Sequence, residues 1–223
     1  MRRTSSLHVI AAPPRRRGRP PTAGMRQRIL RAAESVFLRK DFHEVRMDDV
    51  AGACGVGKGT LYRYFESKDA LFTALVLDGI DHLRSQLESA VAGPGEPVAK
   101  LERVVRASLA HLWERRFLFA LLHRREHKPS RTDAREWERR RARLAKVVED
   151  AVREATDAGQ VRPVDPRITA ETLLALLRAM DRTRRPADSL DALSTSVFDL
   201  FLCGAGTAKG QQAWKHARWR RTS

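Results

Sequence analysis

The chain has little cysteine and no long apolar run. Its two cysteines, Cys54 and Cys203, lie in different segments, so they do not make a disulfide framework and we expect both to be reduced. No stretch approaches the ~20 apolar residues of a membrane-spanning helix. The apolar segment LHVIAAPP near the N-terminus is short and is followed by RRRGRPP, which is not the pattern of a secretory signal. These absences predict a cytoplasmic protein with no membrane insertion.

Strand-like alternation of polar and apolar residues is also missing, whereas helical periodicity recurs from end to end. A hydrophobic content of 42% in 223 residues is ample for a core. The sequence therefore predicts an all-α fold of about eight or nine helices.

The groups that catalysis or metal binding needs do not converge in the sequence. None of the seven histidines has metal-ligand spacing with a nearby cysteine or carboxylate. His123 and His127 stand four apart, but no third ligand is evident. No serine lies in a nucleophile elbow, and no strand is predicted to present one. We therefore expect no enzyme activity, no metal and no cofactor.

Acidic residues are missing from both ends of the chain, which carries a net charge of +16. Six arginines precede Met25, and five lysines and arginines follow Cys203. A nearly neutral body with two cationic arms is the distribution expected when the arms meet a polyanion. In the C-terminal arm, Trp214 and Trp219 are interleaved with basic residues, a pattern that suits nucleic acid, an anionic membrane surface or an acidic partner.

The twenty residues MDDVAGACGVGKGTLYRYFE, from Met47 to Glu66, read as two short helices joined by a sharp turn. Gly55 stands where the chain must turn with a positive φ. Ala51 is small where a second helix has to cross closely. Apolar residues at helical spacing on both sides of the turn supply a core: Met47, Val50, Ala51, Cys54, Val56, Leu61 and Phe65.

The second of these helices keeps donors, a hydroxyl and aromatic rings with polar tips for its outward face, and it has no acid. Phosphates attract cations and hydroxyls, while base edges attract donors and apolar bodies. This composition predicts a helix that enters the DNA major groove. The residues expected in the groove are Lys58, Thr60, Tyr62, Arg63 and Tyr64, with Gly57 and Gly59 beside them.

A phosphate-binding loop is the rival interpretation of the same residues, because Gly52, Gly57 and Lys58 have the spacing GxxxxGK[ST]. Gly59 stands where a hydroxyl is needed for magnesium, and Thr60 comes one place too late. No apolar strand precedes Gly52. The DNA-binding helix-turn-helix is therefore favoured over this loop, and also over an ordinary solvated helical hairpin.

The segment GVGKGTLYRYFESKDAL is similar to the recognition segment of the tetracycline-repressor (TetR) family of bacterial transcription regulators. The resemblance extends upstream through RILRAAESVFLRKDFHEVRMDDVA and covers about Met25 to Leu71. The family usually has Gly at the position of Asp41 and Ser or Thr at the positions of Arg46 and Gly57. Arg46 cannot cap a helix, but its guanidinium could hold a phosphate, and we assign Lys68 the same role.

The resemblance implies a homodimeric repressor that binds a near-palindromic double-stranded operator and is released by a small-molecule effector. It also implies a helix-turn-helix DNA-binding domain over residues 25–68 and a helical regulatory and dimerisation domain over 69–203. Outside the resemblance, composition predicts a flexible basic arm over residues 1–24 and a basic tryptophan-containing tail over 204–223.

The last two helices of the body carry apolar residues on more than one side, which one small core does not require. Packed against the same pair from a second chain, they would form a four-helix bundle, as in the resembling family. The predicted interface consists of Leu173, Leu177, Met180, Leu190, Leu193, Val197, Leu200 and Phe201.

An apolar cavity between helices is a usual place for a ligand in a helical bundle. Ordinary core packing is the alternative role for each candidate wall residue. These candidates are Leu75, His111, Trp113, Phe117, Leu121, Trp137 and Leu144.

A second hypothesis for the whole chain is an architectural or nucleic-acid-coating protein whose tails dominate binding and give low specificity.

Overall fold

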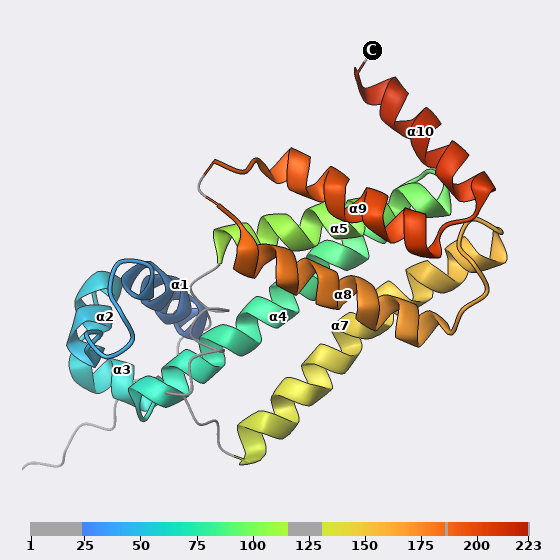
Figure 1. The fold of residues 1–223 in the computed structure, drawn as a ribbon. Helices are drawn as coiled ribbons and strands as arrows, with labels where there is room; N and C mark the ends of the chain where they lie inside the picture. The colour runs from blue at the N-terminus through green and yellow to red at the C-terminus, as the bar shows by residue number, and fades with distance from the viewer. Residues whose placement is uncertain (1–23, 116–130, 186, 223) are drawn as a thin grey trace, which may run out of the picture.

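The computed structural model describes residues 24–115, 131–185 and 187–222. Over these residues the chain is helical, with one isolated β-bridge between Val161 and Gly206, so the predicted all-α fold is confirmed (Figure 1). No helix in these ranges is long and apolar enough to cross a membrane. The helices are α1 (Met25–Phe37), α2 (Met47–Cys54), α3 (Lys58–Tyr64), α4 (Lys68–Ala92), α5 (Pro97–Glu114), α7 (Arg131–Asp157), α8 (Pro166–Thr183), α9 (Leu190–Ala205) and α10 (Ala208–Thr222).

Residues at the helix ends set these boundaries as the sequence predicts. Gly55 (φ 68°) ends α2 and Gly159 (φ 70°) follows α7, both in the left-handed region that favours glycine. The Ser67 hydroxyl accepts a hydrogen bond from a first-turn backbone N–H of α4 at 3.0 Å. The Asp165 carboxylate does the same for α8 at 2.8 Å. The short helix expected over residues 117–122 lies outside the described residues.

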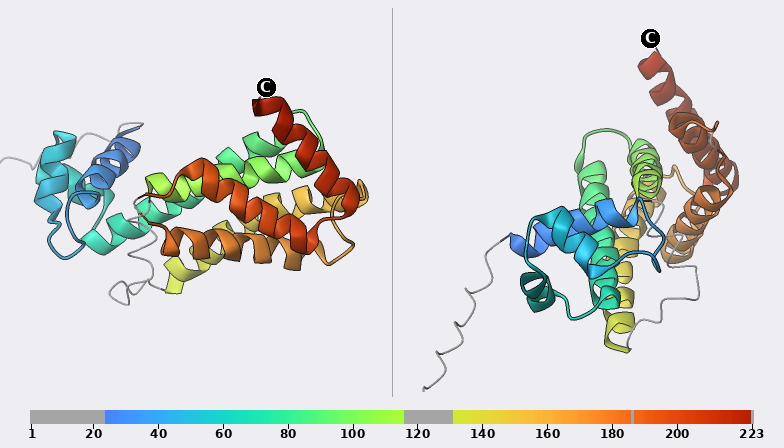
Figure 2. Two further views of the ribbon diagram at one scale, coloured as in Figure 1. Left: turned by 45° about the horizontal axis from the view of Figure 1, so that its top comes forward. Right: turned by 90° about the vertical axis from the view of Figure 1, so that its left-hand side faces the viewer.

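Helices α1, α2 and α3 gather at one end of the molecule, and α4 runs from them into the rest of the chain (Figures 1 and 2). Together with the first turns of α4 they enclose a core of their own, and we call residues 25–76 the head. Phe37, Phe42 and Phe72 pack there with ring centroids 5.3 to 5.9 Å apart. The head is thus held as one unit on the tip of α4.

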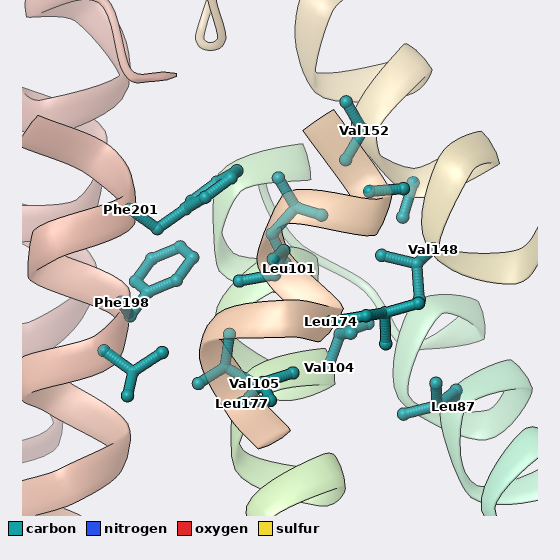
Figure 3. Close-up of a cluster of buried hydrophobic side chains, with 14 of the residues drawn as sticks. Leu87, Leu101, Val104, Val105, Val148, Val152, Leu174, Leu177, Phe198 and Phe201 are labelled. Carbon is teal, nitrogen blue, oxygen red and sulfur yellow. The ribbon is translucent and has the colours of Figure 1, made fainter. Parts of the chain in front are cut away.

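The remaining helices form the body, residues 77–215, with α5 packed against α4, α7, α8 and α9. Figure 3 shows how the side chains interleave: Leu101 and Val104 of α5 lie among Val148 of α7, Leu174 of α8 and Phe198 of α9. All five are at most 6% exposed. The body therefore completes its core within one chain.

This core corrects half of the predicted dimer interface. Four of its eight residues are at most 4% exposed in a single protomer, because α5 packs against both α8 and α9 and covers the face that the sequence seemed to leave open. Leu200, which is 63% exposed, does offer apolar surface. The four buried residues are Leu173, Leu177, Val197 and Phe201, while Met180, Leu190 and Leu193 are partly buried against the same core.

The start of the C-terminal segment is also part of the body, which corrects the prediction of a separate tail from residue 204. Trp214 of α10 is 6% exposed, its ring stands edge-on to Phe198 at 4.8 Å, and its Nε1–H donates to Asp199 at 2.8 Å. A Cβ at Gly210 would lie 2.1 Å from the backbone oxygen of Gln160, so only glycine allows this approach. Helix α10 thus docks at the end of the body opposite the head (Figure 2).

Candidate nucleic-acid interface and ligand cavity

Helix α3 is anchored by few residues. Leu61 is fully buried, and Phe65 at the C-terminal end of the helix is 4% exposed beneath the Arg26 guanidinium, which lies 5.2 Å from the ring centroid. The turn before α3 is closed by a hydrogen bond from the Val56 N–H to the Ala51 carbonyl at 3.0 Å. The outer face of α3 therefore remains exposed to solvent.

The outward surface of α3 carries the residues that the sequence predicts for a DNA groove. Lys58, Gly59, Tyr62 and Arg63 are exposed. Tyr62 is 43% exposed, so an aromatic body stands in water beside two cations. Cations, a phenol and bare backbone on one short helix match what phosphates and base edges bind. Gly57 precedes the helix, and Thr60 and Tyr64 are half-buried at the edges of this surface.

Lys58 is held by an acid of the neighbouring helix. Its Nζ lies 3.0 Å from the Asp48 carboxylate of α2, and this hydrogen bond raises the pKa of Lys58 above its ordinary value. Both side chains are largely exposed. Because an exposed ion pair is weak, a DNA phosphate can replace Asp48 as the partner of Lys58.

Arg46 precedes α2 and gives it no side-chain cap, as the sequence predicts. Its backbone N–H instead donates to the Asp49 carboxylate at 3.0 Å, and Lys40 pairs with the same carboxylate at 3.0 Å. These two contacts, the Arg46 hydrogen bond first, hold the pKa of Asp49 below its ordinary value. The exposed Arg46 side chain has a helix N-terminus beside it, a site that favours phosphate.

Lys68 has a different environment from the one expected of a phosphate ligand. Its Nζ donates to the carbonyl of Phe42 at 2.6 Å and lies 3.4 Å from that of His43, and it stands 4.5 Å from the centroid of the Phe42 ring. The ammonium therefore ties α4 to the loop between α1 and α2. A phosphate contact by Lys68 would have to replace these bonds.

Gly57 and Gly59 are not required by the packing of the head. Neither has a positive φ, and a Cβ at either position would meet nothing within 4 Å. Glycine inside a helix is less stable than alanine. Gly59 thus leaves the outer surface of α3 without a side chain at a cost in helix stability, while Gly57 leaves the N-cap position equally open. Both suit close approach of a nucleic-acid backbone.

The body contains a cavity of about 460 Å³, within the size range of small-molecule sites. It lies between α4, α5, α7 and α8. Of the predicted wall residues, Trp137 and Leu144 line it. Phe117 and Leu121 lie outside the described residues.

Three predicted wall residues are placed elsewhere, which corrects the prediction. Leu75 is fully buried in the core of the head. Trp113 stacks under Arg184, whose guanidinium carbon lies 3.7 Å from the ring centroid. His111 is buried beside Gln86, with its Nδ1 3.2 Å from the amide oxygen. The sequence offered these three as large side chains of the body but did not show which helix faces border the cavity.

His111 is kept neutral by its surroundings. Burial, with smaller contributions from Arg115 and His82, lowers the pKa of His111 to about 3. Because the amide oxygen of Gln86 can only accept, the ring proton lies on Nδ1. The residue therefore serves as a fixed hydrogen-bonding group within the core.

Two structural links join the cavity to the head. Trp137, on the cavity wall, packs against the cores of both head and body. On α5, Ser108 and Leu112 line the cavity, and Arg115 at the end of the same helix pairs with Glu34 of α1 at 3.0 Å. Burial raises the pKa of Glu34 above its ordinary value, whereas Arg115 opposes that shift.

The fold and this surface define a helix-turn-helix protein with a helical, cavity-containing body. The model of bacterial regulatory proteins of the tetR family matches residues 29–75, and the tetracyclin repressor-like C-terminal domain matches residues 94–182. The chain belongs to the TetR family and is a transcriptional regulator with a DNA-binding helix-turn-helix.

The curated relatives are regulators as well. An uncharacterized HTH-type transcriptional regulator of Mycobacterium tuberculosis is 39% identical over 74 residues, which are 33% of this chain and only 37% of that protein. The HTH-type transcriptional regulator UidR of Escherichia coli is 24% identical over 152 residues, 68% of this chain and 76% of UidR.

Solved structures share the fold. A TetR/AcrR-family regulator from Thermobifida fusca has a TM-score of 0.70 at 24% identity and covers 80% of this chain and 97% of its own. AibR, in complex with isovaleryl coenzyme A and operator DNA, has a TM-score of 0.62 at 22% identity, with coverages of 79% and 97%. At these identities the likeness shows the fold alone.

Proposed function

We propose that the chain is a repressor that binds a near-palindromic operator as a homodimer and is released when a small molecule occupies the body cavity. One observation carries the ligand response. Thr73, Leu77 and Asp133 line both the cavity and a second hollow that reaches Tyr62 and Arg63 on α3. A ligand that displaces the residues of this shared wall therefore changes the orientation of α3.

Helix α5 offers a second route from the cavity to the head. A shift of Ser108 or Leu112 is transmitted along a rigid helix to Arg115 and so to Glu34 on α1. Asp78 of α4 joins the same cluster, 3.8 Å from the Arg115 guanidinium. A ligand shifts the equilibrium between two conformations only if it binds one of them more tightly. We therefore expect the ligand to bind more tightly to the conformation whose head orientation fits the operator poorly.

The dimer is proposed to form through α8 and α9. Among the described residues, the large apolar side chains that stand exposed include Val164, Ile168 and Leu200, which lie on these helices or in the turn before α8. A two-fold interface uses the same patch on both chains, so this surface suffices for both partners. AibR, which shares the fold, was solved with a coenzyme A thioester and operator DNA, which supports the same two partners of this class here.

The experiment that tests this function is an unbiased selection of DNA sequences bound by the full chain. A regulator selects a defined sequence with two inverted half-sites, because dimer symmetry is mirrored in operator symmetry. An architectural or coating protein, the alternative that the basic ends of the sequence support, selects no consensus. Selection of a single, non-repeated motif would contradict the homodimer.

A regulator of this kind acts where the chromosome is, so we place its proposed function in the cytoplasm.

Once an operator has been selected, its affinity is compared with that of a shuffled duplex of equal length. Their affinity ratio at several salt concentrations separates base readout from phosphate binding.

A further inference from the structure

The cavity wall contains a hydroxyl that the fold leaves unsatisfied. Ser108 of α5 is 2% exposed, and its Oγ has no hydrogen-bond partner among the described residues. A serine in a helix ordinarily bonds the carbonyl four residues earlier, as Ser89 does with Ser85 at 3.0 Å. A buried hydroxyl without a partner is rare because its desolvation is not repaid. In a cavity wall it marks a contact that a ligand completes.

The same wall contains a cation without an ion pair. Arg178 of α8 is half-buried and lines the cavity, and no described carboxylate lies within ion-pair distance of it. Its neighbour Arg141 is already paired with Glu171. Burial and then the charge of Arg141 lower the pKa of Arg178, against the opposing effect of Glu171. The guanidinium is thus held at an electrostatic cost that an anion would relieve.

The rest of the wall limits what that anion can be. Most of it is apolar, with Val76, Ile80 and Leu83 on α4 facing Leu144 and Leu174.

Two acids of α7, Asp133 and Glu138, also line the cavity. They repel any group that carries several negative charges. One unpaired cation among apolar side chains, with acids beside it, fits a single negative charge on an apolar skeleton.

We propose that the cavity binds an amphipathic monoanion, an apolar chain or ring skeleton with one carboxylate, in which the carboxylate pairs with Arg178 and a ligand oxygen accepts the Ser108 hydroxyl. This inference rests on the proposed role of the cavity as the effector site and adds the charge class of the effector. The fork of the guanidinium suits the planar carboxylate in particular.

The test compares three ligands with the same ten-carbon chain by titration calorimetry on the full protein. Decanoate, decanol and decylamine carry charges of about −1, 0 and +1 at neutral pH. We expect decanoate to bind about 10-fold more tightly than decanol, since a hydrogen bond to a charged group contributes roughly 1.5 kcal/mol. Decylamine, whose charge is opposite to that of decanoate, should bind more weakly than decanoate. Equal affinities for all three, or no binding of decanoate, would overturn the inference.

Substitutions in the cavity wall test which residues cause the preference for decanoate over decanol. Arg178→Gln should reduce the preference for decanoate over decanol to about 2-fold, and Arg178→Lys should retain most of it because the charge remains. Ser108→Ala should weaken decanoate about 5-fold, the worth of one hydrogen bond. The control is Arg143→Gln, an exposed arginine of α7 outside the cavity wall, which should change nothing. An unchanged preference in Arg178→Gln would contradict the assignment.

A fourth ligand tests whether the cavity prefers a free carboxylic acid or its coenzyme A thioester. Decanoyl coenzyme A has the same chain but several phosphate charges, so it should bind more weakly than decanoate beside Asp133 and Glu138. Tighter binding of the thioester would overturn the single-charge assignment. Operator release is measured in parallel. Decanoate that binds with the expected charge preference but leaves the operator complex intact would refute the proposed function while supporting the charge class.

Discussion

At the scale of single residues, the recognition surface is built at the expense of helix stability. Gly59 stands inside α3 and Gly57 immediately before it, although a side chain at either position would meet no other group of the described chain within 4 Å. The Gly-rich start of α3 could be recognised in the sequence, but only the structure shows that packing does not demand it. We assign its use to the approach of DNA.

Replacing Gly59 with alanine should separate stability from binding. The free energy of unfolding should rise by roughly 0.5 kcal/mol, because alanine is the better helix former. Operator affinity should fall because the added methyl meets the DNA backbone. Chemical denaturation and fluorescence anisotropy measure the two effects. Gly52→Ala, at an equally open position of α2, is the control and should gain stability with its affinity unchanged. Full operator affinity in Gly59→Ala would refute the role given to this glycine.

The buried His111 makes a prediction about pH. Its folded pKa of about 3 lies below the unfolded value of 6.5, so the unfolded state binds more protons between these values and stability falls as pH falls below 6.5. From pH 7.5 to 5.5 this group should reduce the free energy of unfolding by about 1 kcal/mol. Urea denaturation at both pH values should show a smaller loss in His111→Gln. An identical loss in both proteins would contradict the assignment.

At the scale of whole elements, the ends of helices could be predicted and the partners of their faces could not. Ser67 and Asp165 mark helix starts because their side chains bond backbone donors locally. The apolar residues of α8 and α9 predict that their faces are buried but not which helix buries them. In the structure, α5 of the same chain packs against both helices. Gly210 likewise permits a close helix contact that the sequence does not reveal.

The docking of α10 predicts that Trp214 stabilises the body. Trp214→Ala should lower the free energy of unfolding by about 3 kcal/mol, because it removes a buried ring packed against Phe198 and one hydrogen bond to Asp199. Chemical denaturation measures the change. Lys215→Ala, at the next and exposed position, should have little effect. A loss below about 1 kcal/mol for Trp214→Ala would show that α10 is not a structural part of the body.

The proposed dimer can be tested at a position that the protomer core does not use. Leu200→Glu places a charge on the exposed face of α9, so it should give monomers without unfolding the chain. Analytical ultracentrifugation measures the mass, and circular dichroism the helix content. Leu38→Glu, at a leucine after α1 that is 53% exposed and lies in the head, is the control and should leave the mass unchanged. A monomeric unmodified protein at micromolar concentration would contradict the proposal.

At the scale of the whole molecule, charge and fold have separate parts in the proposed mechanism. The two ends of the sequence supply cations without acids, which favour any DNA. The head supplies α3, which we expect to discriminate between sequences, and the body supplies the cavity. The motif was enough to predict the helix-turn-helix of the head, which the family model confirms, whereas the DNA contacts of α3 and of the basic ends stay predictions. The cavity wall could not be predicted because it depends on how α4, α5, α7 and α8 are set against one another.

The central claim, that α3 reads base sequence, is tested most directly by the affinity of Arg63→Ala for the selected operator and for a shuffled duplex. Arg63 is exposed on α3 and is expected to contact a base edge. The substitution should cost roughly 1 to 3 kcal/mol on the operator and much less on the shuffled duplex. Arg46→Ala, a phosphate contact by expectation, should weaken both equally and lower the salt slope by about one. Equal losses on both duplexes for Arg63→Ala would contradict the account.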